Sequence, residues 1–135
     1  TPYTLFGSDA TARATSGPRG KGKPHPRAFG TFARILAHYV REGGVIPLET
    51  AIQKMTSLAA DRLGLSNRGR LAPGAAADIV VFDPGTVRDT ATFKEPKQLA
   101  EGIAHVLVNG EFALRDSQIT GALHGQVIRG IGARH

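Results

Sequence analysis

The sequence predicts an α/β segment followed by a small antiparallel β unit, and this combination does not close into a fold by itself. Three observations predict it: one apolar, strand-like run near the start, two stretches with helical apolar spacing, and a strong hairpin signal in the last third. One strand and two helices would leave both strand edges unpaired. We therefore expect these 135 residues to be part of a larger fold.

The first element is a buried strand over residues 3–8, which contains Tyr3-Thr4-Leu5-Phe6. Aspartate is a poor strand former, so the strand is predicted to end with Asp9 at its C-terminal tip. Glycines and prolines make residues 10–28 a loop that ends in His25-Pro26-Arg27. A carboxylate at a strand tip, facing a loop that carries an arginine, is typical of the active-site rim of parallel α/β enzymes. Asp9 can equally cap a turn.

Two helices follow the loop. Apolar residues recur at three and four positions between residues 29 and 41, and Gly43-Gly44 ends this helix. A second apolar stripe, with Met55 in it, predicts a helix over residues 48–63 that Gly64 closes.

After Gly69 the pattern changes to strands. The apolar run 77–82 predicts one strand, and residues 105–108 and 111–115 flank Asn109-Gly110. Asn and Gly accept the positive φ of a type I′ turn, so this pair predicts a hairpin. Residues 86–101 are expected to be loop with one helical turn at most, and a last short strand is expected at 126–129.

Composition excludes several classes of protein. An apolar fraction of 41% favours a packed core over disorder, and no apolar run is long enough to span a membrane. The start of the sequence has no signal-peptide pattern, so the cytoplasm is the default location. The absence of cysteine excludes disulfides and thiolate metal sites.

The positive charge gathers in the loop and the first helix. Residues 1–46 hold seven Lys and Arg against Asp9 and Glu42, whereas the remainder holds ten against nine. Such a basic region suits an anionic substrate, a nucleic acid or plain solvated surface. With 6% aromatics and no Trp, stacking platforms for nucleic acid are scarce, so a basic nucleic-acid-binding module is the weaker alternative.

A phosphate-loop pattern within the loop does not predict nucleotide binding. Gly17 to Lys23 reads G-x-x-x-x-G-K, but Pro24 stands where a Ser or Thr should bind magnesium. No strand precedes it, and the prolines prevent the helix that should follow.

Several blocks resemble one enzyme family. They are Gly7-Ser8-Asp9, the run from His25-Pro26-Arg27 to Phe32, Lys54-Met55-Thr56-Ser57, the stretch from Gly69 to Pro84, and Val106 to Gly110. Together they resemble the C-terminal part of an N-acyl-D-amino-acid deacylase (D-aminoacylase), in the metal-dependent amidohydrolase superfamily. The resemblance implies the last strand and helices of a (β/α)₈ TIM barrel over residues 1–66, and part of a C-terminal β-sandwich over residues 67–135.

The resemblance also implies the chemistry. Such an enzyme uses zinc to hydrolyse the amide of an N-acyl-D-amino acid. Asp9 would be the general base beside the metal, and His25 would line the substrate site or stiffen the loop. Arg27 would bind the substrate carboxylate; its alternatives are a surface arginine and a partner for Asp9 itself. The other metal ligands would lie outside this chain, so the segment alone would be inactive and its partner would be the remainder of the enzyme. No nucleic-acid or membrane partner is implied.

Two departures from the family limit what carries over. The loop between Asp9 and Arg27 has extra residues, and Ala10 follows the aspartate where many members have glycine. The side chain of the substrate therefore stays open, although Arg19, Lys21 or Lys23 would suit an acidic one. Another amidohydrolase, hydantoinase-like or dihydroorotase-like, is the alternative enzyme, and the His25-Pro26-Arg27 motif argues against it.

The incomplete fold has a structural consequence. Surfaces that await the rest of the enzyme should leave Asp9 on an open face and many apolar side chains exposed. None of the remaining histidines stands in a His-x-His or His-x₃-His pair, so we expect no metal site built within the chain itself.

Overall fold

A computed structural model describes residue 1 and residues 3–128. The chain divides into two compact units. The first, here called the sheet unit, comprises Thr1–Leu5, Ile52–Phe82 and the chain from Ile103 onward. The second, here called the loop unit, comprises Phe6–Ala51 and Asp83–Gly102. The domain boundary expected at residue 66 stays a prediction.

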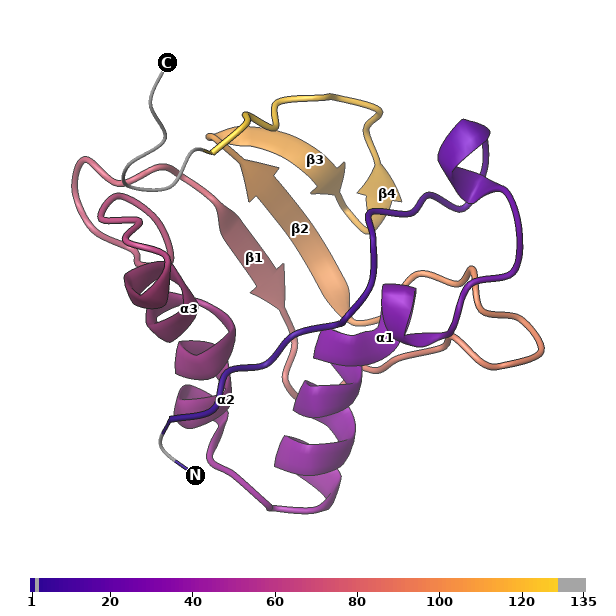
Figure 1. The fold of residues 1–135 in the computed structure, drawn as a ribbon, viewed down its shortest axis with the longest axis horizontal. Coiled ribbons are helices and arrows are strands. Elements are labelled where there is room, and N and C mark those ends of the chain that lie inside the picture. Colours follow the sequence, from indigo (N-terminus) through magenta and orange to yellow (C-terminus); the bar gives the residue numbers. More distant parts are fainter. Residues whose placement is uncertain (2, 129–135) are drawn as a thin grey trace. The chain divides into compact units, whose positions relative to one another are not determined.

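The sheet unit contains four antiparallel strands in the order β1-β2-β3-β4 (Figure 1). They are β1 (Ile79–Phe82), β2 (Ile103–Val108), β3 (Glu111–Arg115) and β4 (Gln118–Ile119). The predicted hairpin is confirmed: Asn109 and Gly110, at φ 50° and 88°, connect β2 to β3. β4 was not predicted, because its turn is made by Asp116 and Ser117, both at positive φ, rather than by a glycine.

The expected last strand is not present where the structure describes it. Residues 126–128 form no strand, and residue 129 lies outside the described residues.

The predicted helix over residues 48–63 forms as two helices, α2 (Leu48–Met55) and α3 (Ser57–Arg62). The backbone leaves helical geometry at Thr56, whose φ and ψ are −126° and −91°. Gly69 comes close to this break, since a Cβ there would lie 2.8 Å from the Cβ of Ala60 and 3.0 Å from the carbonyl oxygen of Thr56. The apolar stripe continues through both helices, so the sequence pattern alone did not indicate the interruption.

In the loop unit, α1 (Arg27–Arg34) continues directly into the π-helix η2 (Ile35–Glu42), and a short 3₁₀ helix, η1 (Pro18–Gly20), lies in the preceding loop. The predicted helix over residues 29–41 is confirmed and begins two residues earlier. Its second half has wider turns than an α-helix, a difference that an apolar spacing of three and four does not distinguish. The N–H of Gly43 donates to the carbonyl of His38 at 2.9 Å, and the helix ends at the predicted glycines.

The segment 83–102 of the loop unit contains no helix, but a single turn at its start is closed by hydrogen bonds from the N–H groups of Thr86 and Val87 to the Asp83 carbonyl. Arg88 and Glu101 form an isolated antiparallel bridge. Val87 beside it is fully buried. Gly102 has φ 77°, and a Cβ there would lie 2.5 Å from the backbone nitrogen of Val87. Only glycine permits this close approach.

The strand predicted for residues 3–8 is wrong for this chain. These residues form no strand, because no strand within residues 1–128 pairs with them. The expected exposure of apolar side chains is confirmed: Tyr3 is 91% exposed, Leu5 39% and Val80 54%. The buried apolar residues of the described chain are few and mostly small: Ala33, Ile35, Ala37, Ala51, Ala60 and Val87.

Candidate active site

Asp9 and Arg27, eighteen residues apart in the sequence, form an ion pair in the loop unit. The Nη2 atom of Arg27 lies 2.9 Å from Oδ2 of Asp9. Asp9 has φ 49°, in the left-handed region, which aspartate tolerates better than most side chains. Its side chain is 88% exposed, so the expectation that Asp9 lies on an open face is confirmed.

His25 stabilises the start of the helix that carries Arg27. The backbone N–H of Arg27 donates to Nδ1 of His25 at 3.1 Å, and the next N–H, that of Ala28, donates to the His25 carbonyl. The first N–H groups of a helix have no partner within it, so this ring acts as a cap. Because Nδ1 accepts a hydrogen bond, the ring proton lies on Nε2 in the neutral form.

A cavity of about 240 Å³ brings the three predicted site residues together. It is lined by Asp9, Ala10, Thr11, Arg13, Pro24, His25, Arg27 and Ala28. Two guanidinium groups and one carboxylate therefore surround it. Such a cavity suits a small anion better than a cation.

A second cavity, of about 440 Å³, adjoins His25 and Arg27 from the side of residues 89–93. The Phe93 ring packs edge-on against the His25 ring, with centroids 4.8 Å apart. Gly30 of α1 permits this segment to approach, since a Cβ there would lie 3.1 Å from the Cβ of Asp89. Sequence reasoning missed this wall because Phe93 lies in a polar stretch with no periodicity, and only its distance in space from His25 identifies it.

The loop between Asp9 and Arg27 is folded on itself. Gly20 is buried, and its N–H donates to the Gly17 carbonyl at 3.0 Å. The ammonium of Lys97 donates to the Gly20 carbonyl at 2.8 Å and so connects the loop to the segment 83–102. The hydrogen bond from Lys97 thus holds the middle of the loop in place. Its two residues are 77 positions apart in the sequence, so no local pattern predicts it.

The residues of this site do not make a zinc site on their own. Within residues 1–128, apart from the undescribed residue 2, no group of three His, Cys, Asp or Glu side chains could hold a metal ion. Asp9 and His25 are the two such residues that line the cavity, and Asp9 is paired with Arg27. Zinc sites in proteins use three or four such ligands. The described residues alone therefore lack the ligands that a zinc site needs.

A comparison with protein families decides the identity of the fold. A model described as the Amidohydrolase family matches residues 6–113, a range that includes Asp9, Arg27 and the β2–β3 hairpin. The chain belongs to the amidohydrolase family.

Similar proteins show which branch of the amidohydrolases this chain resembles. A D-aminoacylase from Alcaligenes xylosoxydans xylosoxydans is 49% identical over 125 residues, which are 93% of this chain and 24% of the relative. A crystal structure of D-aminoacylase is 53% identical, with a TM-score of 0.71, over 74% of this chain and 21% of its own. The chain thus spans about a quarter of the length of these relatives, and the predicted resemblance to D-aminoacylases is confirmed.

A further solved relative carries a metal. A crystal structure of N-acyl-D-glutamate deacylase from Bordetella bronchiseptica is complexed with zinc and a phosphonate inhibitor that mimics the tetrahedral intermediate of its reaction. This chain is 48% identical to it, with a TM-score of 0.67, and covers 23% of its length. The fold of this segment is therefore shared with a D-aminoacylase and with an N-acyl-D-glutamate deacylase.

In the part of this chain that the structure describes, no helix is long and apolar enough to cross a membrane.

Proposed function

We propose that this chain is the C-terminal segment of a zinc-dependent N-acyl-D-amino-acid deacylase. The complete enzyme hydrolyses the amide bond and releases a D-amino acid and a carboxylic acid. The observation that carries the proposal is the ion pair of Asp9 and Arg27 in one open cavity, in a chain 49% identical to a D-aminoacylase. These two side chains supply a proton acceptor and a carboxylate-binding group for one small substrate.

Arg27 binds the free α-carboxylate of the substrate in this proposal. A planar guanidinium can hold a carboxylate with two parallel hydrogen bonds, which fixes which end of the substrate lies where. In the structure, Oδ2 of Asp9 lies 2.9 Å from Nη2 of Arg27 and occupies one of these positions. The incoming carboxylate replaces Asp9 as the partner of Arg27, so substrate binding releases the carboxylate that the reaction needs.

Asp9 then acts as the general base. Its carboxylate accepts a proton from the water that attacks the acyl carbonyl carbon, and the C–N bond breaks as the proton passes to the leaving amine. His25 lines the same cavity and keeps the first turn of α1 in place through Nδ1. In this role His25 positions Arg27, and its Nε2 stays available to the substrate.

The proposed function also assigns this chain a place in the fold of the complete enzyme. In the complete enzyme, where strands of the remaining barrel would pair with residues 3–8, residues 1–66 form the last strand and helices of a TIM barrel, and residues 67–135 belong to a β-sandwich. The zinc ligands, and most of the barrel, come from the remainder of the enzyme, and Asp9 lies beside the metal. The segment alone would lack activity for this reason.

An assay of the complete enzyme tests the proposed function. We expect hydrolysis of N-acetyl-D-amino acids, measured as release of free amine, and no hydrolysis of the L-enantiomers. The corresponding D-amino-acid amides, which lack the free carboxylate, should be poor substrates because Arg27 has no partner in them. Ring opening of a hydantoin or of dihydroorotate, with no cleavage of acyl-D-amino acids, would overturn the proposal in favour of another amidohydrolase.

A further inference from the structure

Lys54 is a buried charged side chain that the proposed reaction does not use. It lies on α2 and is 7% exposed, the least exposed charged residue of the described chain. No carboxylate lies within ion-pair distance of it among the described residues. Burying an ammonium group is costly unless its donors find partners, so the contacts of Lys54 need an explanation.

All three ammonium donors of Lys54 are used on the first residues of the chain. Its Nζ donates to the carbonyl oxygens of Thr1 at 2.8 Å and Thr4 at 2.7 Å, and to the Thr4 hydroxyl at 3.2 Å. An ammonium has three donors, so the group is fully satisfied. The sheet unit contains both Lys54 and residues 1–5.

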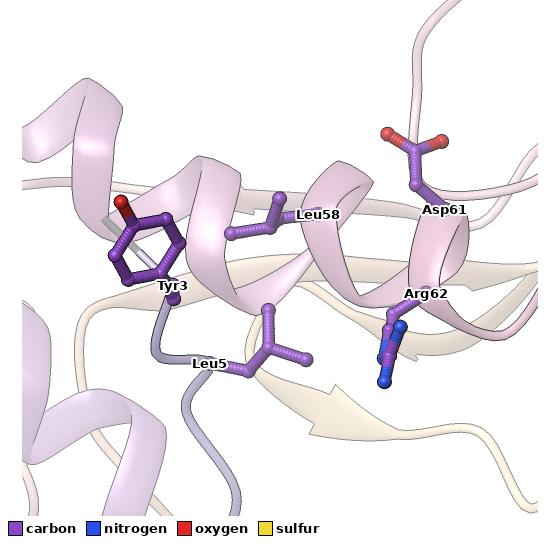
Figure 2. A pocket seen from close by; sticks show the side chains of 5 residues that line it. All are labelled: Tyr3, Leu5, Leu58, Asp61 and Arg62. Atoms are coloured by element: carbon purple, nitrogen blue, oxygen red, sulfur yellow. The ribbon is translucent and has the colours of Figure 1, made fainter. Parts of the chain in front are cut away.

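These three hydrogen bonds attach the N-terminal segment, here Thr1 and residues 3–5, to α2. Among the described residues, which exclude residue 2, the other hydrogen bonds of this segment are local ones between Thr1 and Thr4. Tyr3 and Leu5 face Leu58 of α3 across a cavity of about 570 Å³, also lined by Asp61 and Arg62, and do not close it (Figure 2). Apolar packing on this side is therefore incomplete, and the hydrogen bonds from Lys54 provide the specific attachment.

We propose that Lys54 is a positioning residue for the general base of the deacylase. The proposal rests on the proposed function, in which Asp9 is that base. Thr4 precedes Asp9 by only five residues, so fixing the carbonyl of Thr4 restricts where the chain can deliver the Asp9 carboxylate. Lys54 touches neither substrate nor Asp9, and acts through the backbone that joins Thr4 to Asp9.

The test compares three variants of the complete enzyme. Lys54→Met removes the ammonium and keeps an unbranched side chain of similar length, whereas Lys54→Arg keeps a charge and several donors. Gln53→Met is the matched control, because Gln53 is an exposed polar residue on the same helix and does not line the cavity beside Tyr3 and Leu5. Each variant is examined by steady-state kinetics on an N-acetyl-D-amino acid and by amide hydrogen exchange.

For Lys54→Met we expect kcat to fall on the order of tenfold to a hundredfold, because a misplaced reacting group costs rate rather than binding. KM should stay within about twofold, since Arg27 still binds the carboxylate. Exchange should become faster in residues 3–9 and stay unchanged in residues 103–115. Lys54→Arg should recover part of both losses, and Gln53→Met should behave as the wild type.

The double variant with Asp9→Asn separates positioning from general stability. If Lys54 acts through Asp9, Lys54→Met should reduce kcat no further once Asp9 is already replaced. A further loss of the same size in the double variant would overturn the proposal, as would a kcat of Lys54→Met within twofold of wild type. If Lys54→Met does not fold, Lys54→Arg decides by the same readouts, and faster exchange spread evenly over the chain would contradict positioning.

The same data separate this inference from the proposed function. Full activity of Asp9→Asn would remove Asp9 as the base, whatever Lys54 does. A strong effect of Asp9→Asn together with no effect of Lys54→Met would remove only the role of Lys54.

Discussion

At the scale of single residues, the ion pair of Asp9 and Arg27 contributes little to stability, and we propose for it a role in function instead. Exposed ion pairs contribute on the order of 0–1 kcal/mol, and the Asp9 side chain is 88% exposed. In the proposed function, the pair keeps the guanidinium of Arg27 facing the cavity. The sequence predicted both residues, but the direct contact between them depends on the fold of the intervening loop.

Replacing Arg27 by lysine tests the binding of the substrate carboxylate. We expect KM to rise by roughly tenfold with a small change in kcat, because one ammonium replaces a bidentate fork that holds substrate and transition state alike. Steady-state kinetics of the complete enzyme on an N-acetyl-D-amino acid give both constants.

The matched control is the same substrate with its carboxylate converted to an amide. Arg27→Lys should change its hydrolysis far less. An equal loss for acid and amide would show that Arg27 acts on something other than the carboxylate.

At the scale of elements, a polar network fixes the β2–β3 hairpin of the sheet unit. Asp78 accepts hydrogen bonds from the backbone N–H of Asn109 at 2.8 Å and from the Arg68 guanidinium. Arg68 also donates to the Asn109 side chain at 2.8 Å. The bond from the Asn109 N–H, followed by that from Arg68, holds the pKa of Asp78 below its ordinary value. The stretch from Gly69 to Pro84 and the stretch from Val106 to Gly110, which resemble the enzyme family separately, are thus joined through Asp78 and Asn109 into one structural unit.

Asp78→Asn should loosen this hairpin at neutral pH. We expect its opening free energy to fall by about 1 kcal/mol, a value kept low because the carboxylate is partly exposed and screened. Hydrogen exchange over residues 103–115 of the complete enzyme should become about fivefold faster. The pKa of Asp78 is lower in the folded state, so its contribution is present above about pH 4 and is lost as the pH falls through the folded pKa.

The difference between wild type and Asp78→Asn should therefore shrink in acid. Asp116→Asn is the control, because Asp116 is a 79% exposed carboxylate in the neighbouring β3–β4 turn. If the opening free energies of the wild type and of Asp78→Asn differed by the same amount at pH 7 and at the lowest pH measured, the electrostatic explanation would be contradicted.

Local sequence signals predicted some elements of this chain, whereas contacts between distant residues determine others. Elements with local signals were predicted: α1 by its apolar spacing, and the β2–β3 hairpin by Asn109-Gly110. Features that depend on distant contacts were not, among them the break at Thr56 beside Gly69 and the Phe93 wall against His25. The strand at residues 3–8 failed for the same reason, since strand structure needs a neighbouring strand.

At the scale of the whole molecule, the chain shows the features of one part of an enzyme. It belongs to the amidohydrolase family and spans 24% of a D-aminoacylase relative. Large apolar side chains such as Tyr3 and Leu71 are more than four-fifths exposed. The predicted site residues Asp9, His25 and Arg27 lie in one cavity, yet the described residues form no metal site. A catalytic role for Asp9 therefore needs the remainder of the enzyme.

The central claim is that this segment supplies the general base of a deacylase, and Asp9→Asn in the complete enzyme tests it most directly. Turnover of an N-acetyl-D-amino acid and bound zinc, by elemental analysis, are measured on the same sample. We expect kcat to fall by roughly a hundredfold to ten-thousandfold, the range for losing a positioned acid–base group, with bound zinc largely retained. A kcat close to that of the wild type would contradict the claim.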